Sequence, residues 1–214
     1  MANTNGAFGL RPVGKMGQNT NSTGATEYRI AAANTNAIYQ GSPVIPLAAG
    51  VIDIVGAAAG GTVGLLGVFA GCEYVSSTTG EKVFSNQWPG SGADSNFPVK
   101  AFVYDDPAQL FVIATSNVVA GFNTEAEVRA AIFANANFAT ADAGTAATGL
   151  STGTLDLNTI ADTAALQMRI MGIQEDPENA DFTAAGIPMI VRLNNHFNSP
   201  NGGIAAGTPS TTGV

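Results

Sequence analysis

The stretch GTVGLLGVFAGCEYV (residues 61–75) begins the part of the chain that decides the fold. It is followed by Gln87-Trp88-Pro89, by VKAFVY (residues 99–104) and by Asp105-Asp106-Pro107. Short apolar, β-branched and aromatic runs that are separated by Gly, Pro, Ser and Asn are typical of strands joined by turns. Residues 61–107 therefore predict a β-rich centre, which the rest of the chain elaborates.

Glycines at positions 61, 64, 67 and 71 recur every three or four residues in this stretch. In a helix each would cost roughly 1 kcal/mol relative to alanine, so we expect bulged or closely packed strands instead. The spacing does not match G-x-G-x-x-G, and the Gly-Lys-Ser/Thr of a phosphate-binding loop is absent from the sequence. The stretch therefore predicts a scaffold and no nucleotide site.

The apolar residues around Cys72 are predicted to pack in the core or between subunits. Cys72 is the only cysteine, so no disulfide forms within the chain, and no neighbour in the sequence would lower the pKa of its thiol. Trp88 is the only tryptophan, and such residues anchor packing more often than they present a ligand platform. The predicted packing residues are Val68, Phe69, Cys72, Tyr74 and Trp88.

Further short strands are predicted on both sides of this centre. Their spacing of about eight to twelve residues is typical of a barrel or a sandwich of antiparallel strands. Leu166, Met168 and Ile170 alternate with polar residues, which indicates a half-buried strand. Thr124 and Glu127 match a capping box, so we expect a short helix through about residue 134, with a strand as the alternative. The predicted class is mainly β with at most one or two short helices.

The chain divides into three expected parts. Residues 1–26 are rich in Asn, Gly, Thr and Ser, which predicts an extended N-terminal arm or, equally, a frayed terminus. Residues 27–120 form the predicted β-rich core. Residues 121–214 form a second β-containing lobe, with a flexible loop at 138–154 and a mobile C-terminal tail.

Composition and charge restrict the class of function. Only 11% of the residues are charged and the net charge is −8, so the sequence lacks the general basic character that nucleic-acid binding requires. A largely neutral surface suits packing against other copies of a protein. Residues 1–52 hold three basic residues and one acidic residue, so this segment suits an acidic neighbour; a few solvated charges on a loose arm are the alternative. No apolar run approaches the roughly 18 residues of a membrane span, and no secretory signal pattern is found.

The sequence predicts no catalytic, cofactor or metal site. His196 is the only histidine and Cys72 the only cysteine. One residue of each type is too few for a conventional zinc site. On a strand, the consecutive carboxylates of Asp105 and Asp106 would point to opposite faces and could not act together. The sequence Asp105-Asp106-Pro107 is instead typical of a turn. A second acidic group lacks the spacing of a calcium loop, and a solvated turn around Pro177 is favoured there. Its members are Glu175, Asp176, Glu178 and Asp181.

Several segments resemble small structural proteins of tailed bacteriophages, especially marine and cyanobacterial ones. They are the opening MANTNGAFGLRPVG (residues 1–14), GSPV (41–44), GVFAGCEY (67–74), Trp88-Pro89, Asp105-Asp106-Pro107, Leu155-Asp156, LQMRIMG (166–172) and VRLNNH (191–196). These are packing and turn residues and not chemical ones. The chain thus resembles the capsid decoration, or cement, proteins.

This resemblance implies a role on the outside of a phage shell. It implies the major capsid protein as partner, a homo-oligomer (a trimer favoured, a dimer possible) and location on the virion exterior after synthesis in the host cytoplasm. Composition and hydropathy add that neither nucleic acid nor membrane is expected as a partner. Arms of such proteins extend over neighbouring capsomers, and buried area at many sites supplies avidity. The residues expected to contact the shell are Phe8, Leu10, Arg11, Val13 and Lys15.

Three alternatives remain at this point. Another virion part, such as a tail tube or tail protein, fits the same composition. A hydrolase is disfavoured because no catalytic constellation is seen. A carbohydrate-binding module would use Trp88, Tyr74 and Tyr104 as its sugar platform.

Overall fold

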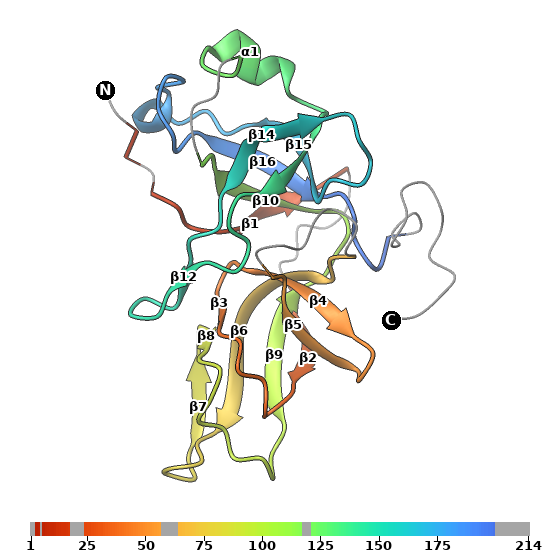
Figure 1. Ribbon diagram of the computed structural model, residues 1–214, viewed down its shortest axis with the longest axis vertical. Helices are drawn as coiled ribbons and strands as arrows, with labels where there is room; N and C mark the ends of the chain where they lie inside the picture. The colour runs from red at the N-terminus through yellow and green to blue at the C-terminus, as the bar shows by residue number, and fades with distance from the viewer. Residues whose placement is uncertain (1–2, 5, 18–23, 57–63, 117–120, 200–214) are drawn as a thin grey trace.

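The computed structural model of the chain describes residues 3–4, 6–17, 24–56, 64–116 and 121–199. These residues form two six-stranded antiparallel sheets, one above the other along the long axis of the molecule, and a single α-helix (Figure 1). The predicted mainly β class is confirmed. Neither six-stranded sheet closes into a barrel within the described residues, which is consistent with the sandwich alternative.

The lower sheet contains the stretch that decides the fold. Its order is β2-β9-β6-β4-β5, and β7 pairs with β6 at one side. A short ribbon of two strands, β3 and β8, lies beside it. The bounds are β2 (Thr26–Ile30), β3 (Ile38–Tyr39), β4 (Pro43–Leu47), β5 (Val51–Ile54), β6 (Gly67–Val75), β7 (Lys82–Ser85), β8 (Gln87–Trp88) and β9 (Val99–Tyr104).

The glycines of β6 permit close approach of neighbouring backbone. A Cβ atom on Gly67 would collide with the carbonyl oxygen of Tyr104, and one on Gly71 would lie 2.9 Å from the carbonyl oxygen of Ser85. The register between β6 and β9 shifts between Phe69 and Gly71, as in a β-bulge. The prediction of bulged, closely packed strands is therefore confirmed for these two positions, whereas Gly61 lies outside the described residues.

The upper sheet has the order β1-β10-β16-β15-β11-β14. Met168 and Ile170 of β15 are fully buried while Arg169 between them is partly exposed, which confirms the predicted alternation for these three residues. It fails at Leu166, which is partly exposed, and at Gln167, which is buried, because both lie before β15 begins. The helix α1 (Glu125–Ala130) packs on this sheet through Val128. The strands of this sheet are β1 (Arg11–Lys15), β10 (Gln109–Ala114), β11 (Asn135–Phe138), β14 (Leu155–Ala161), β15 (Met168–Ile173) and β16 (Pro188–Leu193). The strands β12 (Gly144–Thr145) and β13 (Leu150–Ser151) form a separate pair, and η1 (Pro177–Asn179) is a short 3-10 helix.

The N-terminal segment differs from the expected arm. Residues 11–15 form β1, which pairs with β10 in the upper sheet, and Leu10 is 1% exposed in the core. The physical reason is burial: Leu10 packs into the upper core, and the strand after it completes hydrogen bonds that an arm would leave to water. The sheet therefore includes a segment that composition alone assigned to an arm.

Two other expected boundaries also differ. The strand β10 belongs to the upper sheet with β15 and β16, so the change from one sheet to the other falls near Asp106 and not near residue 120. The expected flexible loop at 138–154 contains the β12–β13 pair, and the Ser151 backbone N–H donates to the carbonyl of Gln40. In the expected tail, His196 is 1% exposed, because Leu65 pairs with it through an isolated bridge; residues 200–214 lie outside the described part.

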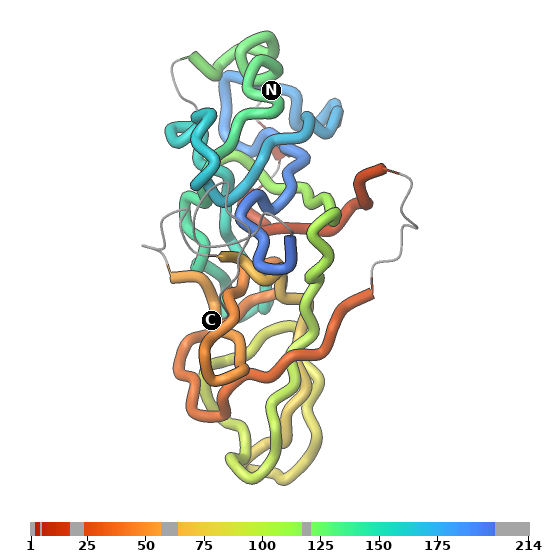
Figure 2. Tube along the Cα trace, turned by 90° about the vertical axis from the view of Figure 1, so that its right-hand side faces the viewer, coloured from red at the N-terminus to blue at the C-terminus, as the bar shows by residue number. Residues whose placement is uncertain are grey.

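The two sheets have separate cores that meet at β6. Val68 belongs to the upper core, whereas the next residue, Phe69, belongs to the lower core. Successive residues of a strand point to opposite faces, so β6 contributes to both. The tube in Figure 2 shows β9 (Val99–Tyr104) continuing upward from the lower part into the upper part. This junction is where the N-terminal segment, the β9–β10 turn and residues 195–198 meet.

Candidate binding surface at the junction of the sheets

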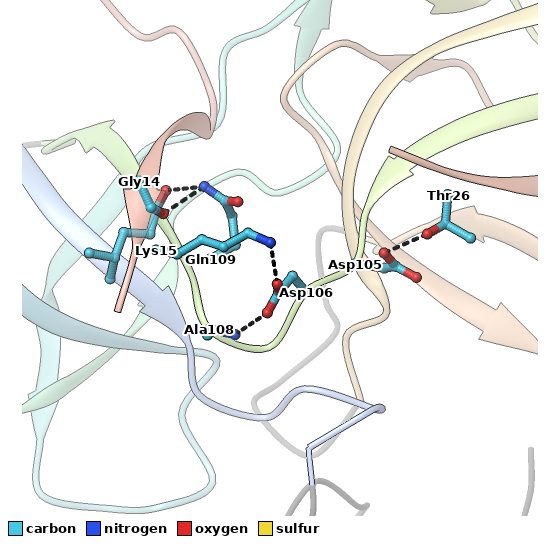
Figure 3. Close-up of polar contacts among 8 residues, drawn as sticks. Gly14, Lys15, Thr26, Asp105, Asp106, Ala108 and Gln109 are labelled. Atoms are coloured by element: carbon cyan, nitrogen blue, oxygen red, sulfur yellow. Dashed lines mark hydrogen bonds and ion pairs between the residues drawn. The ribbon is translucent and has the colours of Figure 1, made fainter. Parts of the chain in front are cut away.

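The turn between β9 and β10 links the two sheets through its two carboxylates (Figure 3). The Asp106 Oδ2 atom lies 2.6 Å from Lys15 Nζ. The Asp105 carboxylate accepts hydrogen bonds from the Thr26 hydroxyl at 2.8 Å and from the Tyr28 hydroxyl at 2.7 Å. One carboxylate therefore holds β1 of the upper sheet, and the other holds β2 of the lower sheet. The predicted turn is confirmed.

The pKa values follow from these contacts. The Lys15 ammonium and the backbone N–H of Ala108 lower the pKa of Asp106 from its ordinary value of 3.8. Burial, and then the hydrogen bond to Asp105, raises the pKa of Tyr28 to about 12. Because the hydroxyl stays protonated and the Asp106 carboxylate stays ionised, both contacts persist across neutral pH. The two aspartates act as structural acceptors.

His196 is buried beside the same turn. Its Nδ1 accepts a hydrogen bond from the backbone N–H of Asn198 at 3.1 Å, and its buried Nε2 has no hydrogen-bond partner in the described structure. Burial lowers the pKa of His196 to about 4, although Asp105 and Asp106 oppose this change. The imidazole is therefore neutral at pH 7.

A groove of about 400 Å³ opens at the junction. The Arg11 guanidinium lies 4.3 Å from the centroid of the Phe8 ring at its rim, a cation–π distance. The groove combines apolar walls with one cation. Its lining residues are Phe8, Leu10, Arg11, Pro12, Gln40, Gly41, Phe69, Tyr104 and Leu150.

The structure separates the five residues expected to contact a shell. Arg11 and Val13 are exposed and Phe8 is half-buried, so these three are available to a partner. Leu10 is buried, and the Lys15 side chain is 13% exposed and bound to Asp106. Leu10 and Lys15 therefore hold the segment in place, because the core and the ion pair already occupy them.

β1 is one of the two edge strands of the upper sheet in the described structure, and β14 is the other. It carries a register shift between Pro12 and Gly14, with Val13 at the bulge and 47% exposed. The Gln109 side chain donates to the carbonyl of Gly14 at 2.8 Å and ties this strand to β10. Edge strands present backbone donors and acceptors to other chains. The edge of β1 and the groove together form the candidate surface.

The predicted packing residues lie in the molecule as follows. Val68, Phe69, Cys72 and Trp88 are buried, whereas Tyr74 is partly exposed. The Trp88 Nε1 donates to the carbonyl of Asn34 at 3.2 Å, and its ring meets that of Tyr74 edge to face at 5.5 Å. Burial raises the pKa of Cys72 to about 12. A fully buried Trp88 offers no face to a sugar, which disfavours the carbohydrate-binding alternative.

Sequence reasoning did not single out three exposed phenylalanines: Phe84, Phe97 and Phe133, which are 71%, 50% and 73% exposed. Phe84 lies on the outer strand β7, where exposed and partly buried residues alternate, but the sequence Lys-Val-Phe-Ser does not itself alternate and gave no signal. Phe133 has a positive φ of 78°, which the sequence gives no means of detecting. None of these residues lines the junction groove.

Neither a cluster of metal ligands nor a membrane-spanning helix is found in the described residues. No group of three or more His, Cys, Asp or Glu side chains there is arranged to hold a metal ion. Within the same residues no helix has the length and apolar character to cross a bilayer.

Comparison with protein-family models, with curated proteins and with solved structures found no match for this chain.

Proposed function

We propose that the chain is a capsid decoration protein of a tailed bacteriophage. It binds the virion exterior and stabilises the shell by bridging subunits of the major capsid protein. The observation that carries the proposal is the exposed edge of β1, where Arg11 and Val13 lie beside the junction groove. The resemblance of the opening residues and of residues 67–74 and 166–172 to such proteins supports it.

The edge of β1 suits contact with another protein chain. An added strand gains affinity from main-chain hydrogen bonds and specificity from pockets for alternate side chains. Here Val13 supplies an apolar contact, Arg11 a planar cation, and the groove a cavity of about 400 Å³ for a partner side chain. Arginine and buried apolar anchors carry much of the energy of protein interfaces. Repetition over many shell sites adds avidity.

Binding to shells that lack the protein tests this surface. We expect Val13→Asp and Arg11→Glu each to weaken co-sedimentation with shells by roughly tenfold or more, since each removes an anchor from the contact. These point variants are preferable to removal of residues 1–20, because Leu10 belongs to the core.

Leu47→Asp is the matched control. Leu47 is 37% exposed on β4 of the lower sheet, away from β1, so this variant should bind shells as the unmodified chain does. Circular dichroism establishes that each variant is folded. Equal shell binding by Val13→Asp, Arg11→Glu and Leu47→Asp would contradict the assigned surface.

Location on the particle tests the function itself. Cryo-electron microscopy of particles carrying the protein should place it on the outer face of the shell. Finding it only in the tail would overturn the decoration role in favour of a tail component.

A further inference from the structure

Two arginines lie directly opposite each other on the upper sheet. Arg169 of β15 pairs in register with Arg192 of β16, and both side chains are partly exposed. Their strand neighbours Met168, Ile170, Val191 and Leu193 are buried in the upper core, so the arginines occupy the other face of the sheet. Like charges in direct opposition on one face destabilise a strand pair.

No carboxylate in the described structure forms an ion pair with this arginine pair. In contrast, a carboxylate partner is found for each of Lys15, Lys82, Lys100 and Arg129. Arg169 donates through Nε to Asn135 Oδ1 at 3.0 Å. Arg192 reaches the Met16 sulfur at 3.9 Å through Nη1, and its buried Nε has no hydrogen-bond partner among the described residues.

Burial and the nearby charge of Arg169 destabilise the charged form of the Arg192 side chain. Burial, and then the charge of Arg169, lowers its pKa. A guanidinium has five N–H donors, and among the described residues the only hydrogen bond found for the Arg192 side chain is that of Nη1 to the Met16 sulfur. Half-buried cations are ordinarily paired, so an anion between the two side chains would relieve the repulsion and satisfy the donors.

The acidic turn after β15 provides carboxylates that project outward. Asp176 and Asp181 accept hydrogen bonds within the turn. In contrast, the Glu175 side chain is 85% exposed and lies 3.7 Å from Arg129, at the long limit of an ion pair. Glu178 is exposed, and no ion pair to its carboxylate is found in the described structure. Within this turn, Glu175 and Glu178 are therefore the carboxylates that are most accessible to a partner.

These two features lie at opposite ends of the same strand. Arg169 is near the start of β15, and Glu175 follows its end, which corresponds to about 20 Å at the rise of a β-strand. Figure 1 shows β15 and β16 spanning the upper sheet between these ends. The two features cannot meet within one chain. Complementary surfaces at opposite ends of a molecule produce head-to-tail contacts between copies.

We propose that Arg169 and Arg192 of one copy bind the carboxylates of Glu175 and Glu178 of a second copy. Arginine and carboxylate groups form paired, charge-assisted hydrogen bonds. Repetition of this head-to-tail contact closes a ring when the rotation between copies permits it. The contact uses no residue of β1, of which Arg11 and Val13 are exposed.

Charge exchange on the full chain tests the contact by sedimentation velocity over a dilution series. Arg192→Glu and Glu178→Arg should each weaken self-association by roughly a hundredfold, because each places like charges together. The double variant Arg192→Glu/Glu178→Arg should regain association, since every head-to-tail contact then pairs opposite charges again. Association of the unmodified chain should also weaken as salt is raised.

Arg29→Glu is the matched control, because Arg29 is exposed on β2 of the lower sheet and the variant changes the charge equally. A monomeric unmodified chain would overturn the inference, as would association unaffected by Arg192→Glu or not regained by the double variant. Weakening by Arg192→Glu alone would also overturn it, because Arg192 would then bind a group of the second copy other than Glu178. Since no shell is present, these outcomes are separate from those that test the proposed function.

Discussion

The three residue types that occur once in this chain all serve the interior. Trp88, Cys72 and His196 are the single tryptophan, cysteine and histidine, and each is at most 2% exposed. Cys72 lies in an apolar run, so its burial follows from local sequence. Trp88 stands between Gln87 and Pro89, so only its residue type indicated packing. His196 lies among asparagines, and its burial depends on pairing with Leu65 from far along the chain.

Burial of His196 makes stability depend on pH. Its pKa is lowered from 6.5 to about 4 in the folded chain, so below pH 6.5 the unfolded chain binds a proton that the folded chain does not. The contribution of His196 to the free energy of unfolding is therefore complete above pH 6.5. It decreases as the pH falls toward 4, by up to about 3 kcal/mol. Urea unfolding at a series of pH values measures this slope.

His196→Gln should remove most of that slope between pH 6.5 and pH 5. Asp106 does not confuse the result, because its pKa is lowered from 3.8 and its contribution is lost only at more acidic pH. The same slope in the variant would show that other groups cause it.

The helix α1 shows which part of an element local sequence determines. Thr124 accepts from the Glu127 backbone at 3.3 Å, and Glu127 accepts from the Thr124 backbone at 3.1 Å, which confirms the predicted capping box. The predicted end near residue 134 is too late, since α1 ends at Ala130. The reason is pairing with β15: the Phe133 N–H donates to the carbonyl of Ile170, and the Ile170 N–H donates to that of Ala134.

Removal of the cap should destabilise this element. We expect Thr124→Ala to lower the free energy of unfolding by about 1 kcal/mol, because a backbone N–H loses its side-chain acceptor. Thr124→Ser, which keeps a hydroxyl, should stay close to the unmodified chain. Chemical denaturation of both variants makes the comparison, and equal losses would argue that the threonine methyl group and not the cap is responsible.

The molecule as a whole is held together by β6 and by the Asp105–Asp106 turn. Val68 and Phe69 enter different cores from one strand, and the two aspartates bind strands of different sheets. Damage to one core is thus transmitted to the other through a shared backbone. We infer that both sheets unfold in one cooperative transition.

Trp88 reports on this coupling because it lies only in the lower core. Met168→Ala in the upper core should lower the midpoint of unfolding followed by Trp88 fluorescence, with a loss of about 2–5 kcal/mol. Far-UV circular dichroism should give the same midpoint. An unchanged fluorescence midpoint alongside an altered dichroism midpoint would show two independent units.

Local sequence by itself determined the mainly β class, the turn at Asp105-Asp106-Pro107, the start of α1 and the half-buried pattern of Met168 and Ile170. These features depend on propensity, periodicity and caps, which act between residues close in the chain. Only the tertiary structure decided that Leu10 is core and that β1 is a sheet edge. It also decided that Arg169 lies opposite Arg192. Each of these depends on the register between distant strands, and register is set by packing across the whole sheet.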